Sequence, residues 1–133
     1  MRTTLERFAF EEAWDKRTDA ALSDLRGRLD SLERVRDAKD ISSAVDGEIA
    51  FHSWVYELSG HDLLRSHWQK LVPLVQIYMS IHNRQHGVAG VFMDANHEYL
   101  TLVQGDDRAA LLAHVNDHMQ KGMDAVYASV EAA

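Results

Sequence analysis

The chain has 133 residues, the size of one domain that can bury its own hydrophobic core. Hydrophobic residues make up 46% and charged residues 26%, an ordinary globular composition that argues against disorder. The absence of cysteine excludes disulfide bonds and thiolate metal sites. No apolar run is long enough for a membrane span or a signal peptide, so we expect a cytoplasmic protein without membrane contact.

The net charge of −7, from 14 basic and 21 acidic residues, argues against direct binding to nucleic acid phosphates. The chain contains one proline and seven glycines, too few for a series of short strands and turns. Its eight histidines are many for a small acidic domain. The composition therefore favours helices and leaves the purpose of the histidines to be explained.

Apolar residues recur at three- and four-residue steps, which predicts helices along most of the chain. The helices are expected at about residues 3–16, 18–36, 40–58, 62–83, 94–104 and 107–129. Capping side chains precede the second and third helices: Thr18 or Asp19, and Asp40 or Ser42. Gly60 is placed to end the third helix, Pro73 should kink or split the fourth, and residues 85–91 should form a loop. We predict an all-α antiparallel bundle of about six to seven helices, forming one domain over residues 1–133.

Two polar side chains fall on the apolar face of the third predicted helix. Its inward stripe includes Ile41, Val45 and Ile49, and Glu48 and His52 lie within it. Positions four residues apart differ by about 40° around a helix, so these two side chains project from one face. A carboxylate and an imidazole on a buried face are costly unless they are paired or bound to a cation.

Two further histidines lie on apolar faces of later helices. His97 borders Met93 and Leu100, and His118 follows Leu111 and Val115. One carboxylate and three imidazoles suit a divalent ion of the Zn²⁺, Ni²⁺ or Mn²⁺ class, and facing helices can bring them together. The predicted metal ligands are Glu48, His52, His97 and His118. The alternative is that each histidine is an ordinary hydrogen-bonded core residue.

The sequence gives weaker support for the other histidines as metal ligands. His114 lies one turn before His118 and is placed to join it. The rest are expected at helix caps, on the surface or facing solvent: His61, His67, His82 and His86.

Several segments resemble, in order and spacing, the signature of a known family. Glu48-Ile49-Ala50-Phe51-His52 followed by Leu58-Ser59-Gly60 is similar to Asp-x-x-Phe-His…Ser-Gly-Asn. His97-Glu98-Tyr99-Leu100 followed by Gly105-Asp106-Asp107 resembles its His-x-x-Ile…Gly-Asp segment. The stretch from Ala109-Ala110-Leu111 to His118-Met119 resembles its closing Ala…His-Leu segment, and Arg7 with Glu11 its opening Arg-x-x-x-Glu. From residue 7 to 123 the chain thus resembles the FCD domain, the C-terminal, effector-binding half of FadR-type regulators in the GntR family.

This resemblance implies a ligand-sensing regulatory domain and not an enzyme. In metal-containing FCD domains an Asp and three His bind a divalent ion, which implies the same four residues chosen above. Family effectors are small organic acids, and a carboxylate can complete the ion's open positions with an arginine as second anchor. The ligand-binding residues expected here are Arg7 first, then Arg65, Arg84 and His114.

The chain departs from the family pattern in three respects. Glu48 stands where the family has Asp, and His61 stands where the motif has Asn. The winged helix-turn-helix that precedes the FCD domain in the family is absent from this chain, so DNA contact is expected only through that missing domain. A two-fold DNA reader further implies a homodimer.

Two other functions remain open from the residues alone. The first is a metal-dependent hydrolase or lyase, in which the ion activates water and Glu48 acts as a base. The absence of a spare acid or base other than His114 counts against it. The second is a structural helical module whose polar core groups pair with one another and bind nothing.

Overall fold

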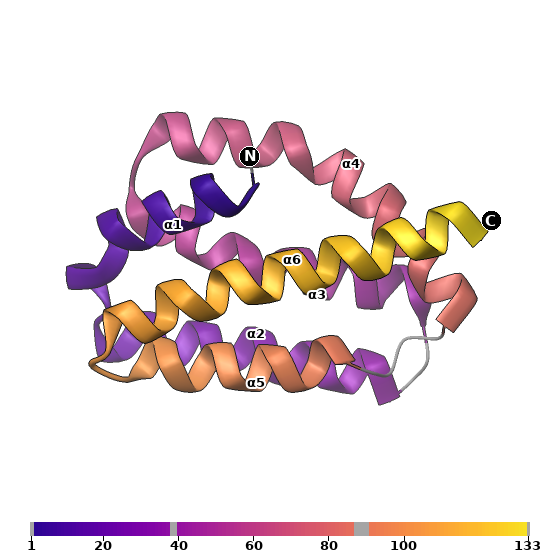
Figure 1. The fold of residues 1–133 in the computed structure, drawn as a ribbon. Coiled ribbons are helices and arrows are strands. Elements are labelled where there is room, and N and C mark those ends of the chain that lie inside the picture. Colours follow the sequence, from indigo (N-terminus) through magenta and orange to yellow (C-terminus); the bar gives the residue numbers. More distant parts are fainter. Residues whose placement is uncertain (1, 38–39, 87–90, 133) are drawn as a thin grey trace.

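The computed structural model describes residues 2–37, 40–86 and 91–132, and this part of the chain forms helices without any strand (Figure 1). The elements in chain order are α1 (Arg2–Ala13), the short 3-10 helix η1 (Trp14–Lys16), α2 (Asp19–Asp37), α3 (Ile41–Ser59), α4 (Asp62–His86), α5 (Val91–Gln104) and α6 (Arg108–Ala132). The predicted all-α bundle is confirmed. None of the helices in the described ranges is long and apolar enough to cross a membrane.

Helix ends follow from local chemistry. The Asp40 carboxylate accepts a hydrogen bond of 3.1 Å from the backbone N–H of Ser43, so Asp40 is the cap of α3. Thr18 caps α2 in the same way, through a 3.1 Å bond from the N–H of Ala21. Gly60 ends α3 with a φ of 66°, in the left-handed region that glycine enters without steric cost.

Some helix boundaries differ from the predicted ones, and Pro73 does not split the fourth helix. The first helix ends at Ala13 and tightens into η1, and α5 begins at Val91, three residues before Asp94. The helix α4 continues through Pro73 without splitting, and its ribbon bends along its length (Figure 1). A proline removes one backbone hydrogen bond and bends a helix without having to end it. The predicted loop at 85–91 is too long, because residues 85 and 86 belong to α4 and Val91 begins α5; residues 87–90 lie outside the described residues.

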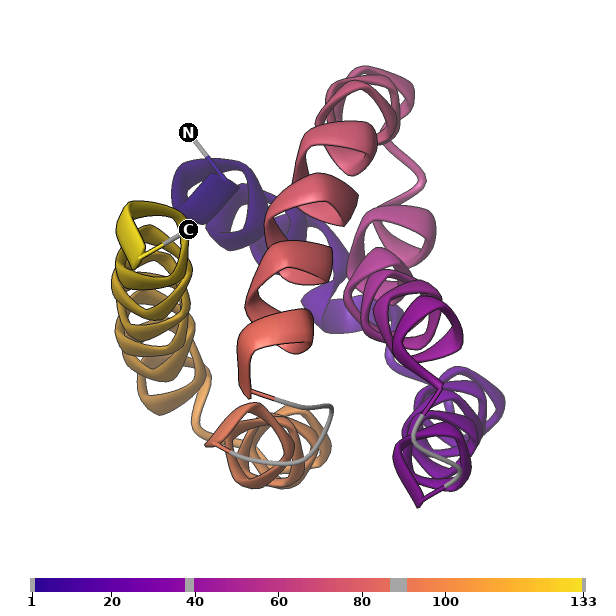
Figure 2. The same cartoon turned by 90° about the vertical axis from the view of Figure 1, so that its right-hand side faces the viewer.

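The helix α3 is central to the bundle, because it packs against α1, α2 and α4. The helix α6 contacts α1, α4 and α5, and α4 runs between α3 and α6 (Figure 2). The helices α2 and α3 approach closely where Leu32 of α2 packs on Gly47 of α3. A side chain at position 47 would not fit, because its Cβ would lie 2.9 Å from Cδ1 of Leu32. Between the helices the core contains a contiguous set of aromatic rings, including Phe10, Phe51 and Tyr99.

Lys16 and Arg17, in and just after η1, donate hydrogen bonds to backbone carbonyls at the C-terminal ends of α3 and α5. The Lys16 ammonium donates a 2.6 Å hydrogen bond to the carbonyl of Ser59, the last residue of α3. The Arg17 guanidinium donates to the carbonyls of Val103 and Gly105 at the end of α5, at 2.7 and 2.8 Å. Both satisfy carbonyls that have no partner inside the helix, and both oppose the negative end of a helix dipole. This segment therefore fixes one end of the bundle.

Candidate functional site

The structure brings three of the four predicted metal ligands together in the core. Glu48 and His52 on α3 and His118 on α6 are 9%, 1% and 8% exposed. Nε2 of His52 lies 3.4 Å from Oε2 of Glu48, as the four-residue spacing predicts. The rings of His52 and His118 stack at a centroid distance of 5.5 Å and an angle of 24°. We call these residues, together with Glu6 and Asn96 described below, the polar cluster.

The prediction that His97 faces the interior is wrong. Its side chain is 53% exposed and contacts the carboxylate of Glu33 on α2. Its neighbour Asn96 is fully buried, and Nδ2 of Asn96 donates a 2.8 Å hydrogen bond to Oε1 of Glu48. Consecutive helix residues point about 100° apart, so packing α5 with Asn96 inward turns His97 outward. The sequence did not decide between the two residues, because Asn96 and His97 lie three and four residues after Met93 and both share its face.

The sequence reasoning also missed Glu6 on α1. This carboxylate is fully buried, and its Oε1 lies 3.5 Å from Nδ1 of His52. Glu6 lies on the face of α1 that contains the buried residues Ala9, Phe10 and Ala13, at helical spacing. A carboxylate on that apolar stripe is the same signal that identified Glu48, and applied to α1 it would have found Glu6.

His114 lies beside the polar cluster, as expected from its place one turn before His118. The two rings stack at 5.8 Å and 6°, and Nε2 of His114 is 3.2 Å from the carbonyl oxygen of Ala95. Among the remaining histidines, His61 acts as a cap, since its Nδ1 accepts from the N–H of Leu64 at 3.4 Å.

His82 and His86, near the end of α4, were both expected to face solvent. His82 is only 9% exposed, so that expectation is wrong for His82. The side chain of His86 lies outside the described part of the structure. His67, in the first half of α4, is exposed, as predicted.

The electrostatics of the polar cluster centre on His52. Burial of the ring acts to lower its pKa, but the facing carboxylates of Glu48 and Glu6 outweigh burial and raise it. Two buried carboxylates face this one imidazole. The polar cluster therefore places two acidic side chains against one imidazole inside the core.

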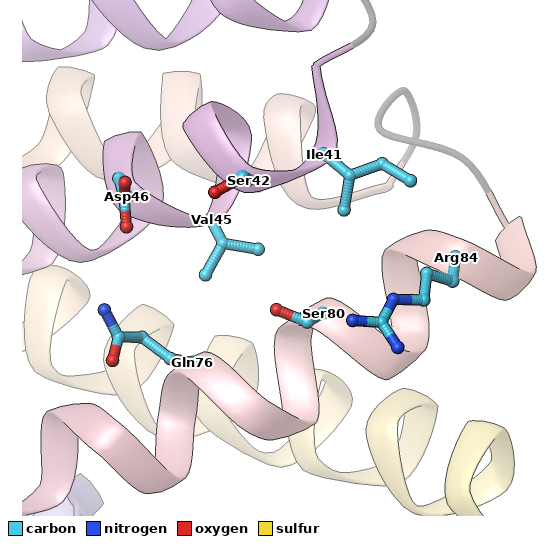
Figure 3. Close-up of a pocket in the computed structure, with 7 residues that line it drawn as sticks. All are labelled: Ile41, Ser42, Val45, Asp46, Gln76, Ser80 and Arg84. Carbon is cyan, nitrogen blue, oxygen red and sulfur yellow. The ribbon is translucent and has the colours of Figure 1, made fainter.

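The three arginines predicted to bind a ligand are exposed, and none of them belongs to the polar cluster. Arg84 lines a cavity of about 360 Å³ between α3 and α4, where it and Ser80 face Ser42 and Val45 (Figure 3). Arg65 lines a smaller cavity of about 120 Å³. Only the first volume falls within the roughly 300–1,000 Å³ of typical small-molecule sites. Arg84 is therefore better placed than Arg65 to bind an effector, and Arg7 is an exposed residue of α1.

Comparison with known proteins identifies the family. The model of the FCD domain matches residues 1–121. The chain belongs to the FCD domain family. FCD domains are the C-terminal, effector-binding domains of GntR-family transcription regulators. No curated protein and no solved structure matched this FCD domain.

The donor chemistry of this FCD domain fits a divalent ion in part. In residues 2–37, 40–86 and 91–132, no three acidic or histidine side chains already lie close enough to hold one ion. Ligands bound at about 2.0–2.2 Å lie roughly 3–3.5 Å from each other, and the 3.4 Å between Glu48 and His52 matches that separation. Oδ1 of Asn96 has no hydrogen-bond partner among the described residues and faces the same core. The roles of Glu48, His52 and His118 as metal ligands remain predictions.

Proposed function

We propose that this FCD domain senses a small organic acid and binds it at a divalent ion held by Glu48, His52 and His118. The burial of Glu48 and Glu6 around His52 is the observation that carries the proposal. Such a cluster is stable only if cations compensate it. FCD domains belong to regulatory proteins, and we propose that the acid is bound and released unchanged.

The charge of the polar cluster also decides how an acid can bind. Two carboxylates repel a third, so a bare cluster disfavours an anionic ligand. A bound divalent ion would supply the positive charge and the open coordination positions that a carboxylate needs. The side-chain amide of Asn96 donates a hydrogen bond to Glu48, and this bond orients the carboxylate.

Arg84 is the arginine that we assign to the effector. Its cavity is lined by Val45, which lies three residues, or about 4.5 Å of helix rise, before Glu48 on α3. The cavity and the polar cluster therefore adjoin along one helix. A guanidinium can bind a carboxylate through two parallel hydrogen bonds, which suits an acid with a second anionic group.

Regulation requires that the effector favour one arrangement of the helices over another. The polar cluster joins side chains of α1, α3, α5 and α6, so a ligand bound there acts on four helices. We propose that this rearrangement is passed, in a cytoplasmic homodimer, to DNA-binding domains attached to the FCD domain.

The test is a thermal-shift titration of untagged protein stripped with a chelator. Zn²⁺, Ni²⁺ and Mn²⁺ are each added alone, and then with a panel of hydroxy acids, sugar acids and dicarboxylates. We expect the ion to raise the melting temperature and one acid class to raise it further only when the ion is present. An acid recovered unchanged distinguishes a sensor from a hydrolase or lyase. A melting temperature that no ion changes would contradict the proposal.

A further inference from the structure

The side chain of Glu6 is a fully buried carboxylate on an otherwise apolar stripe of α1. Neither of its oxygens makes a hydrogen bond within the described part of the chain. Its ion-pair partner is His52, with 3.5 Å between Oε1 and Nδ1. An uncompensated buried carboxylate is strongly unfavourable, so the position of Glu6 needs an explanation beyond packing.

The two nitrogens of His52 face different carboxylates. Nδ1 is directed to Glu6 on α1, and Nε2 is directed to Glu48 within α3. A neutral imidazole has one N–H and one lone pair, and its surroundings decide which nitrogen has which. An N–H on Nδ1 gives Glu6 the donor that it lacks and leaves the lone pair on Nε2, toward Glu48.

We infer that Glu6 is a positioning residue, which holds the proton of His52 on Nδ1 and thereby aims the Nε2 lone pair at the ligand side of the polar cluster. This inference rests on the proposed function and extends it to α1. Histidines that bind metals commonly donate their second N–H to a carboxylate, which fixes the ring and strengthens the ligand. Glu6 and His52 are placed for this relationship, with 3.5 Å between Oε1 and Nδ1, although they are 46 residues apart in the sequence.

The consequence for sensing is that α1 takes part in the site without touching the ligand. A shift of α1 that moves Glu6 away from His52 would free the ring to turn and would weaken ion binding. By thermodynamic reciprocity, a bound ion would hold α1 against α3. The helix therefore links the occupancy of the polar cluster to the packing of the bundle.

The experiment compares wild type with Glu6→Gln, and with Glu12→Gln on the exposed face of α1 as the matched control. Zn²⁺ affinity is measured by calorimetry, and ¹⁵N NMR of the imidazole reports which nitrogen of His52 carries hydrogen. We expect Nδ1 to carry hydrogen and Nε2 to carry none in wild type when the ring is neutral. Glu6→Gln should bind Zn²⁺ about 10- to 100-fold more weakly, with altered imidazole signals, while Glu12→Gln matches wild type.

Each outcome bears on one of the two proposals. An Nδ1 without hydrogen in wild type overturns the role of Glu6, and this measurement needs no variant and so stands even if Glu6→Gln fails to fold. Unchanged Zn²⁺ affinity in a folded Glu6→Gln also overturns it. If wild type binds no Zn²⁺, Ni²⁺ or Mn²⁺, the proposed function fails, while the NMR signals of His52 in wild type and Glu6→Gln still decide the role of Glu6.

Discussion

The side-chain amide of Asn96 donates a hydrogen bond of 2.8 Å to Oε1 of Glu48, joining α5 to α3 inside the core. Both residues are buried, so the bond replaces water that the carboxylate would otherwise bind. Asn96 thereby occupies the inward position of α5, and His97 remains on the surface beside Glu33. The orientation of Glu48, and with it the shape of the polar cluster, depends on this amide.

Asn96→Ala should destabilise the protein by about 1–3 kcal/mol, because it leaves one oxygen of the buried Glu48 without its donor. Urea unfolding followed by circular dichroism measures the loss. Asn116→Ala, at an exposed position of α6, is the matched control and should change stability by less than about 0.5 kcal/mol. Equal effects of the two substitutions would mean that the hydrogen bond to Glu48 contributes little.

Asn96→His should bind Ni²⁺ or Zn²⁺ more tightly than wild type, because it places an imidazole where an amide now faces Glu48. Calorimetric titration of the chelator-stripped protein measures the affinity. His97→Asn is the companion variant and should leave the affinity unchanged. Tighter binding would show that the inward face of α5 adjoins the ion, and no change would place the ion elsewhere.

His118→Ala and His97→Ala should differ sharply in ion binding. His118 is buried and stacked on His52, whereas His97 is half exposed and contacts Glu33. We expect His118→Ala to weaken Ni²⁺ binding by at least about 10- to 100-fold and His97→Ala to have no effect. Ion content after gel filtration, measured by mass spectrometry, gives the result. A loss in His97→Ala equal to that in His118→Ala would restore His97 as a ligand.

The raised pKa of His52 makes the stability of the metal-free protein depend on pH. Glu6 of α1 and Glu48 of α3 face the ring, with His118 of α6 and Tyr99 of α5 packed against it. A folded pKa above the unfolded one contributes stability that is complete below the unfolded pKa of about 6.5 and lost as pH rises through the folded pKa. Urea unfolding in a chelator between about pH 6 and 9 should show this loss in wild type. A His52→Gln variant with the same pH slope would rule out His52 as its source.

Arg84→Gln should weaken binding of the effector acid about tenfold, the effect of losing roughly 1.5 kcal/mol in a charged hydrogen bond. Ion binding should not change, because Arg84 lies in the cavity between α3 and α4 and not in the polar cluster. Arg65→Gln, in the smaller cavity, is the comparison and should leave acid affinity intact. Calorimetry with the ion-loaded protein measures both affinities. A larger loss in Arg65→Gln would move the effector to the other cavity.

The sequence by itself predicted the helices and the inward direction of the two α3 residues of the polar cluster, Glu48 and His52. Helix periodicity and capping side chains are local properties, so Asp40 and Gly60 marked the ends of α3 correctly. The inward direction of Glu48 and His52 followed from their four-residue spacing within one apolar stripe. The ordered motifs indicated the FCD family, and the family model confirms it.

Only the tertiary structure decided which neighbours complete the polar cluster. On α5 the apolar stripe is wide enough to admit either Asn96 or His97, and a rotation of about 100° exchanges them. Packing of that helix against α6 and α2 selected Asn96. The meeting of Glu6 with His52 depends on how α1 docks on α3, and docking is set by the fit of whole helix surfaces, which no local spacing encodes.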